Sequence, residues 1–293
     1  MSTLKLATNA LHAGHDVTAN GGTRAVPIYQ TTSYVFNNSD HAANLFSLQE
    51  LGFIYTRLNN PTNQILQERL AALEGGIGAV VFASGTAAIA TGLLTLLKAG
   101  DHIVASSSLY GGTYNLLSVT LPRFGITTTF VDASNPDNFA DAVQDNTRAF
   151  FVESLGNPKL DVLDLEAIAE HSKAAEVPFI VDNTVATPAL LNPIKHGANI
   201  VIHSLTKYIG GQGTSLGGAI VDAGTFNWAN GKFPEFTEPS AGYHGLKYHE
   251  ALGAAAYTFK LILEGLRDFG GALSPTNAFN IIQGLETLPI RIK

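Results

Sequence analysis

The chain has 293 residues, of which 45% are hydrophobic and 14% are charged. This length and apolar content allow one large domain or two modest ones, and they exclude disorder as the main state. Lys and Arg number 17 against 24 Asp and Glu, which gives a formal net charge of −7. An acidic balance argues against nucleic acid or an anionic membrane as the main partner, but it is compatible with a local site for a small phosphate.

The chain contains no cysteine, which excludes disulfides, thiolate nucleophiles and cysteine-ligated metals. The start, MSTLKLATNALHAGHD, lacks the charged-then-apolar order of a secretory signal. The uncharged stretch from Gly75 to Leu97 is long enough to span a membrane, but Ser84-Gly85-Thr86 interrupts it and its first part resembles a β-strand. We therefore expect a cytoplasmic protein without a membrane span.

Residues 1–60 are polar and aromatic, rich in Asn, Thr and Ser, and show no sustained helical period. This composition predicts an extended N-terminal arm that lies on another surface rather than forming part of a core. After Asn60-Pro61-Thr62 the spacing of apolar residues predicts a helix over 63–73, which Gly75-Gly76 ends.

Beyond this helix, short apolar runs alternate with helical segments. The runs lie at 79–84, 102–106, 127–132, 148–154, 178–183, 199–204 and 217–222. The helical candidates lie at 85–98, 112–124, 137–143 and 163–175. Strands that are apolar on both faces and separated by helices predict an α/β fold, a mainly parallel sheet covered by helices on both faces.

Ligands of such sheets bind beyond the carboxyl ends of the strands. Three runs end in polar residues, namely Ser84, Asp182 and Ser204, with Thr206 and Lys207 just after the last. If these strands are parallel, all three ends meet at one edge of the sheet.

Each strand end has a functional and a structural interpretation. Ser84-Gly85-Thr86 opens a helix whose free N–H groups suit a phosphate, or Ser84 is only a helix cap. A buried Asp182 needs a cation or several donors, or it caps a helix or forms a structural ion pair. Lys207 becomes a nucleophile or base when it is sheltered, or it is simply solvated. Together, an anion site, an aspartate and a sheltered lysine match what pyridoxal 5′-phosphate (PLP) requires.

The chain also resembles the fold-type I, PLP-dependent enzymes of cysteine and methionine metabolism over essentially its whole length. The matching motifs are Tyr55-Thr56-Arg57, Asn60-Pro61-Thr62, Leu73-Glu74-Gly75-Gly76, Ser84-Gly85-Thr86-Ala87-Ala88, Leu109-Tyr110-Gly111-Gly112-Thr113-Tyr114, Asn157-Pro158, Val181-Asp182-Asn183-Thr184 and Ser204-Leu205-Thr206-Lys207-Tyr208. The resemblance implies an aspartate aminotransferase-like large domain over 61–268, preceded by the arm at 1–60.

The resemblance also implies roles for single residues. Lys207 would hold PLP as a Schiff base and move protons, Asp182 would pair with the pyridinium nitrogen, and Tyr110 would stack on the ring. Asn157 would bond the 3′ oxygen. The phosphate would be held by Ser84, Gly85, Thr86, Ser204 and Thr206.

Tyr55 and Arg57 would complete the phosphate site from a neighbouring subunit, which implies a homodimer or homotetramer. The alternatives are a surface ion pair for Arg57 and a core aromatic for Tyr110.

Within this family, the segments 226–236 and 243–246 resemble the O-acetylhomoserine sulfhydrylase branch of transferases. The implied reaction is γ-replacement on O-acetyl-L-homoserine by sulfide or methanethiol, which gives homocysteine or methionine plus acetate. The alternatives are cystathionine γ-synthase or methionine γ-lyase activity. No HExxH or GxSxG pattern occurs, so we expect no metal site and no serine hydrolase triad.

Members of this family continue well beyond the segment that ends here at Lys293. We therefore expect residues 269–293 to lead toward a C-terminal domain that would supply the arginine for the substrate carboxylate; Arg291 is not assigned that role. Without that domain, we expect Leu261, Ile262, Leu266 and Ile281 to be partly exposed. A non-catalytic remnant that only binds cofactor is the alternative of a different class.

Overall fold

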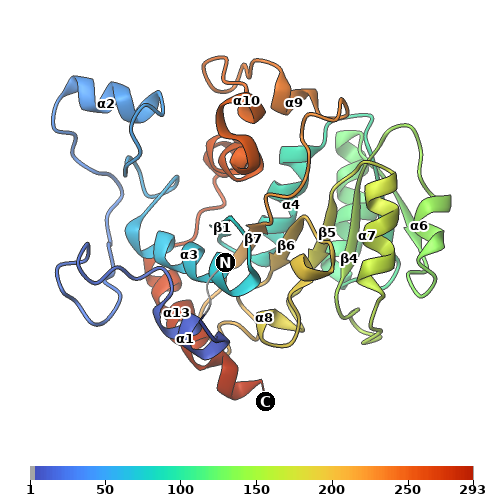
Figure 1. Cartoon of the computed structure of the whole chain (residues 1–293), viewed down its shortest axis with the longest axis horizontal. Helices are drawn as coiled ribbons and strands as arrows, with labels where there is room; N and C mark the ends of the chain where they lie inside the picture. Colours follow the sequence, from blue (N-terminus) through green and yellow to red (C-terminus); the bar gives the residue numbers. More distant parts are fainter. Residues whose placement is uncertain (1–3, 293) are drawn as a thin grey trace.

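A seven-stranded sheet runs through the centre of the molecule in the order β1-β7-β6-β5-β4-β2-β3 (Figure 1). The computed structural model describes residues 4–292. The strands are β1 Gly78–Phe82, β2 His102–Ser106, β3 Thr127–Val131, β4 Thr147–Glu153, β5 Phe179–Asp182, β6 Ile200–His203 and β7 Gly218–Asp222. Neighbouring strands are parallel, except that β7 is antiparallel to both β1 and β6. The predicted α/β fold is confirmed, and every predicted run is a strand to within two residues.

Helices cover both faces because successive side chains of a strand point to opposite sides. On β5, Phe179 and Val181 enter one hydrophobic core, whereas Ile180 enters the other. The first face is covered by α1 Leu6–His12, α3 Pro61–Glu74, α6 Asp137–Asp141, α7 Leu165–Ala174, α8 Thr187–Leu190 and α13 Pro275–Arg291. The second is covered by α4 Gly85–Leu96, α9 Pro234–Thr237, α10 Tyr248–Leu252 and α11 Ala256–Lys260.

Two helical segments are irregular, and one of them, at 112–124, is predicted from the sequence as a single helix. The segment at 112–124 forms α5 Gly111–Asn115, then a π-helical stretch at Leu116–Thr120 and a 3-10 turn at Leu121–Phe124. After the 3-10 turn Gly253–Ala255 and α11, a second π-helical stretch at Leu261–Leu266 leads into α12 Arg267–Phe269. A further 3-10 turn lies at Pro193–His196.

The N-terminal arm is less extended than the sequence predicts. It contains α1 and the separate helix α2 Ser39–Phe46, which stands away from the sheet in Figure 1. Ala10 of α1 is fully buried and Val26 is 5% exposed. Because α1 packs between α3 and α13, the start of the arm belongs to the core, and the expectation of an arm outside the core is wrong for these residues.

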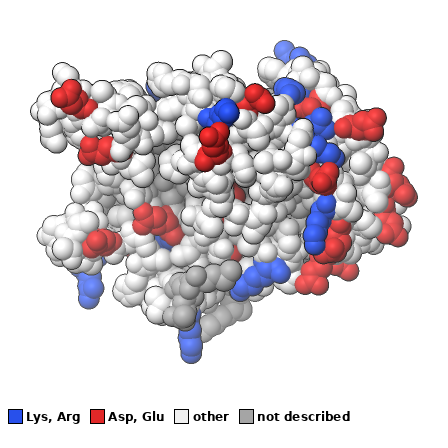
Figure 2. Space-filling view, turned by 45° about the horizontal axis from the view of Figure 1, so that its top comes forward, with Lys and Arg blue, Asp and Glu red and all other residues white. Residues whose placement is uncertain are grey.

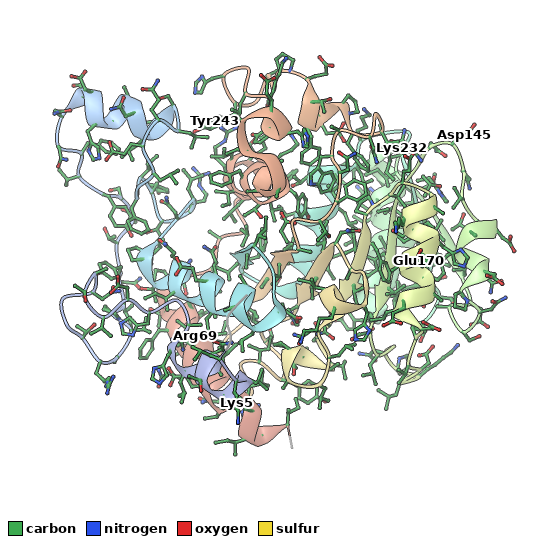
Figure 3. The ribbon with its side chains drawn as sticks, viewed as in Figure 1. Lys5, Arg69, Asp145, Glu170, Lys232 and Tyr243 are labelled. Carbon is green, nitrogen blue, oxygen red and sulfur yellow. The ribbon has the colours of Figure 1, made fainter. Side chains whose placement is uncertain are left out.

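Arg69 joins the arm to the rest of the protein (Figure 3). Its guanidinium group is fully buried on α3, where it donates to the carbonyl oxygens of Ala13 (2.9 Å) and Ala10 (3.2 Å) and pairs with Glu286 of α13. Three segments distant in sequence are thus held by one side chain.

The expected partial exposure of the C-terminal apolar residues is wrong for three of the four. Leu261, Leu266 and Ile281 are between 1% and 4% exposed, and Ile262 is half-buried. The stretch at 261–266 packs on α4, and α13 packs on α1 and α3. These helices therefore bury their apolar faces within the described chain.

Candidate active site

The carboxyl ends of β4, β5 and β6 lie at one edge of the sheet, as parallel pairing requires. Asp182 is the last residue of β5 and is 8% exposed. Its Oδ1 accepts bonds from the Thr184 hydroxyl (2.6 Å) and the Thr184 N–H (3.0 Å). The Thr184 Oγ1 in turn accepts the N–H of Ser204 at 2.7 Å. This chain of hydrogen bonds joins the ends of β5 and β6, so the predicted convergence of Asp182 and Ser204 is present.

The N-terminus of α4 reaches the same place. Ser84 caps α4, with its hydroxyl accepting the N–H of Ala87 at 3.1 Å. A Cβ placed on Gly85 would lie 2.7 Å from the Ser204 Cβ, so the backbone of α4 passes directly against Ser204. Within residues 4–292 the N–H groups of Gly85 and Thr86 have no hydrogen-bond acceptor. Two free donors at a helix N-terminus beside a hydroxyl form a suitable cradle for an anion.

The loop after β6 carries Thr206 and Lys207. The Thr206 hydroxyl bonds both the carbonyl oxygen and the N–H of Gly217, each at 3.1 Å, which fixes the loop. The Lys207 N–H donates to the Ser204 carbonyl oxygen at 3.2 Å. Arg291 of α13 donates to the carbonyl oxygens of Tyr208 (2.9 Å) and Ile209 (3.2 Å). The loop is therefore held from both sides.

The expectation of a sheltered lysine is wrong for this chain. Lys207 is exposed, and its Nζ has no partner among the described residues. The reason is local: within the loop that follows β6, Leu205 and Ile209 are buried in the core, and Lys207 lies between them on the exposed side of the loop. Its ammonium group is thus free to meet a ligand.

Tyr110 follows the end of β2, and Asn157 follows the end of β4. These strands lie next to β5 in the order β5-β4-β2. Both residues are exposed, at 51% for Tyr110, and neither side chain has a hydrogen-bond partner in the described part of the chain. Their backbone N–H groups both donate to Glu153, the last residue of β4. The alternative that Tyr110 is a core aromatic is therefore wrong.

Tyr55 and Arg57 form a separate pair. The Arg57 guanidinium lies 5.6 Å from the centre of the Tyr55 ring, and its Nη1 donates to the Arg267 carbonyl oxygen of the same chain. No hydrogen bond or ion pair links either residue to the other predicted site residues in residues 4–292.

Burial controls the ionisation of the two carboxyl groups at this edge. Desolvation raises the pKa of Asp182, although the two Thr184 hydrogen bonds and the charge of His203 oppose this rise. Desolvation, with repulsion from Asp182, raises the pKa of Glu153 to about 8 despite two N–H donors. Oδ2 of Asp182 accepts no hydrogen bond from the described residues. Oδ2 is thus open to accept a bond from a cationic donor, which would favour the charged form of this largely buried carboxyl group.

Sequence reasoning missed Glu153 and the role of Thr184. The strand-end rule that found Asp182 applies equally to Glu153, which ends the apolar run RAFFVE. Thr184 had a weaker signal, a hydroxyl residue two positions after a buried aspartate.

Figure 2 shows Lys and Arg dispersed among Asp and Glu on the face drawn. In the described residues no three His, Cys, Asp or Glu side chains are placed to hold a metal ion. No described helix is both long and apolar enough to cross a membrane.

Comparison with known proteins identifies the family. The sequence profile described as "Cys/Met metabolism PLP-dependent enzyme" matches residues 7–293. The chain therefore belongs to this family of PLP-dependent enzymes, and the resemblance found in the sequence is confirmed.

Curated relatives match almost the whole chain. The "O-acetyl-L-homoserine sulfhydrylase" of Leptospira meyeri is 56% identical over 98% of this chain and 66% of its own length. The "Homocysteine synthase" of Schizosaccharomyces pombe is 52% identical over 98% of this chain and 67% of its own length. The chain thus spans about two thirds of the length of these relatives.

A solved structure supports the fold and the cofactor. The putative O-acetylhomoserine (thiol)-lyase of Campylobacter jejuni has a TM-score of 0.95 and 42% identity, and the match covers 98% of this chain and 72% of that one. That crystal structure contains a pyridoxyl-lysine phosphate. PLP is therefore the cofactor of this family and of its solved relative.

The close approach of α4 to Ser204 can be tested through Gly85. Gly85→Ala places a Cβ 2.7 Å from the Ser204 Cβ and pushes the α4 N-terminus away from the β6 loop. We expect affinity for PLP to fall about tenfold, the loss of one charge-assisted hydrogen bond, as measured by fluorescence titration. Gly271→Ala, whose Cβ would meet only the Ala87 Cβ at 3.5 Å, is the control. Equal affinity of the two variants would contradict this geometry.

Proposed function

We propose that the chain carries the cofactor machinery of a γ-replacement enzyme that acts on O-acetyl-L-homoserine. The observation that carries this proposal is the 56% identity, over 98% of the chain, with a relative named O-acetyl-L-homoserine sulfhydrylase. Sulfide plus O-acetyl-L-homoserine gives L-homocysteine and acetate, and methanethiol in place of sulfide gives methionine. The reaction needs no metal and no protein thiol, and the chain has no cysteine.

The residues at the sheet edge fit PLP. The free N–H groups of Gly85 and Thr86, with the hydroxyl groups of Ser84 and Ser204, would hold the phosphate. The Thr206 hydroxyl, which donates to the Gly217 carbonyl oxygen in this structure, would join them by turning its O–H to the phosphate. The open Oδ2 of Asp182 would pair with the ring nitrogen. Tyr110 would stack on the ring, and the Asn157 amide would bond the 3′ oxygen. When bound, PLP supplies an electron sink for negative charge at the substrate Cα.

The chain's own residues account for proton transfer and charge. The free Nζ of Lys207 would anchor the cofactor, take the proton from the substrate Cα and return it after the thiol adds at Cγ. Asp182 is buried, so its carboxylate would keep the ring nitrogen protonated. A proton would also leave Cβ, which lets the Cγ–O bond break and release acetate as a Cβ–Cγ double bond forms. The thiol sulfur would then bond to Cγ, and a proton would return to Cβ.

We further propose that the active unit is a homo-oligomer, a dimer or tetramer, and that residues 61–268 form its cofactor-binding domain. Tyr55 and Arg57 lie on the arm and have no bond to their own chain's site. This separation favours a role for both at the phosphate of a neighbouring subunit. The exposed Val35, at 97%, and Leu51, at 73%, give the arm apolar surface for such a contact.

The choice of nucleophile tests the reaction. We expect the initial rate of acetate release from O-acetyl-L-homoserine to be at least tenfold higher with sulfide than with equimolar cysteine. A sulfhydrylase site need not admit the second amino-acid group of cysteine, whose buried charges would otherwise require partners. Acetate can be measured enzymatically, and a reaction without thiol is the control. A faster rate with cysteine would favour cystathionine γ-synthase activity, and thiol-independent release of ammonia would favour a lyase.

A further inference from the structure

Glu153 joins two loops at the candidate site. Its Oε1 accepts the backbone N–H of Tyr110 at 2.7 Å, and its Oε2 accepts the backbone N–H of Asn157 at 3.1 Å. Tyr110 precedes α5, and Asn157 lies in the loop after β4, 47 positions further along the chain. One carboxyl group therefore holds both the loop before α5 and the loop after β4.

The position of Glu153 is itself fixed. It ends β4, is 5% exposed and stands beside Asp182 in the register of β4 and β5. Residues paired in this way on parallel strands point to the same face of the sheet. Glu153 and Asp182 are thus neighbouring buried carboxyl groups, and Asp161 adds a third acidic group nearby.

Two buried carboxyl groups side by side destabilise the fold unless they make other favourable interactions. Burying a second carboxyl group beside Asp182 is unfavourable, and this cost raises the pKa of Glu153 to about 8. An apolar residue would avoid the cost but would leave the N–H groups of Tyr110 and Asn157 without an acceptor. The two hydrogen bonds are what this carboxyl group provides.

We propose that Glu153 is a positioning residue for the cofactor, which acts by holding the Tyr110 and Asn157 loops against the ring site. This inference rests on the proposed function, because the ring contacts of Tyr110 and Asn157 belong to it. Glu153 itself touches neither substrate nor cofactor in this proposal.

The test uses the isosteric variant Glu153→Gln. Glutamine keeps one acceptor oxygen but turns an NH₂ group toward one of the two N–H donors, so one loop loses its bond. At a pH above 8, where Glu153 is ionised, we expect the dissociation constant for PLP to rise about tenfold. We also expect the circular dichroism of the bound cofactor band to weaken, because this signal reports the asymmetric surroundings of the ring.

A matched control separates positioning from general stability. Asp222 also ends a strand, is 4% exposed and accepts a backbone N–H, from Gly224 at 2.8 Å, and a hydroxyl, from Thr258 at 2.8 Å. Because β7 is antiparallel, Asp222 lies at the opposite edge of the sheet. Asp222→Asn should change the melting temperature without changing the affinity for PLP or the dichroism.

A mutant cycle gives the sharpest outcome. If Glu153 acts through Tyr110 and Asn157, the effect of Glu153→Gln on affinity should shrink to less than threefold when both of these side chains are replaced by alanine. A full tenfold effect in that background, or unchanged affinity and dichroism in Glu153→Gln alone, would overturn the inference. If Glu153→Gln does not fold, Glu153→Asp takes its place, since the shorter acid cannot reach both donors. A wild-type chain that binds no PLP would instead refute the proposed function.

Discussion

Replacing Lys207 by alanine will remove the visible absorbance band that PLP gives with the wild-type chain. The band requires a covalent link to the cofactor aldehyde. Lys207 follows the end of β6, three positions after Ser204, and its Nζ has no partner among residues 4–292. We expect turnover of O-acetyl-L-homoserine to fall by on the order of 10²–10⁴-fold, the contribution of a positioned proton-transfer group. Absorbance titration and acetate release measure the two effects.

The control for this variant is another lysine. Lys195 lies on the 3-10 turn before β6, where its Nζ donates to the Asn192 side chain at 3.1 Å. Lys195→Ala should keep both the band and the activity. Since Lys207 is exposed, neither variant should change the melting temperature of the cofactor-free chain by more than about 2 °C. A band that persists in Lys207→Ala would contradict the assignment.

Asp182→Asn should weaken cofactor binding while sparing the fold. Asparagine keeps an oxygen for the two Thr184 bonds but removes the charge, so we expect the dissociation constant for PLP to rise about 10–100-fold. Burial raises the pKa of Asp182. An acid with a raised pKa stabilises the folded chain at low pH and loses this contribution as the pH rises through its folded pKa.

The stability measurement therefore has a definite sign. As the pH rises above the usual aspartate value of about 4, the melting temperature of the cofactor-free wild type should fall relative to that of Asp182→Asn, which cannot ionise at this position. Saturating PLP should raise the melting temperature of the wild type more than that of the variant, because the wild type binds it more tightly. Asp222→Asn controls for the loss of a buried carboxyl group elsewhere. A difference in melting temperature between the two cofactor-free proteins that stays constant as the pH rises would contradict this account.

The sheet was predictable because its signal is local. Each strand is a short apolar run with both faces buried, so hydrophobicity alone located β2 at 102–106 without error. The strand-end rule then selected Ser84, Asp182 and Ser204, and parallel pairing does bring them together.

The features that the sequence did not predict depend on tertiary contacts between residues distant in sequence. The seven-residue helix α1 is too short to show a helical period and is fixed by tertiary packing on α3 and α13. Glu153 was missed because its partners are backbone N–H groups of two loops, and the sequence does not show where these loops run. Lys207 is exposed although Leu205 and Ile209 of the same loop are buried, a difference that the sequence pattern does not predict.

The segment at 226–246 has one feature that the sequence predicts and one that it does not. Its resemblance to one branch of the family is visible in the sequence, but its packing is not. Trp228, 1% exposed, stacks on Phe236 at 4.4 Å and on Tyr257 at 5.4 Å between ring centres. The Tyr243 hydroxyl, labelled in Figure 3, donates to the Phe46 carbonyl oxygen at 2.7 Å and so joins the segment to α2 of the arm.

The central claim is that Lys207 is the residue that holds PLP. The most direct measurement is peptide mapping by mass spectrometry after the wild-type chain is incubated with equimolar PLP and reduced with borohydride. We predict a single pyridoxyl phosphate label, on the peptide that contains Lys207. A label spread over exposed lysines such as Lys195 and Lys98, or its absence from Lys207, would contradict the account.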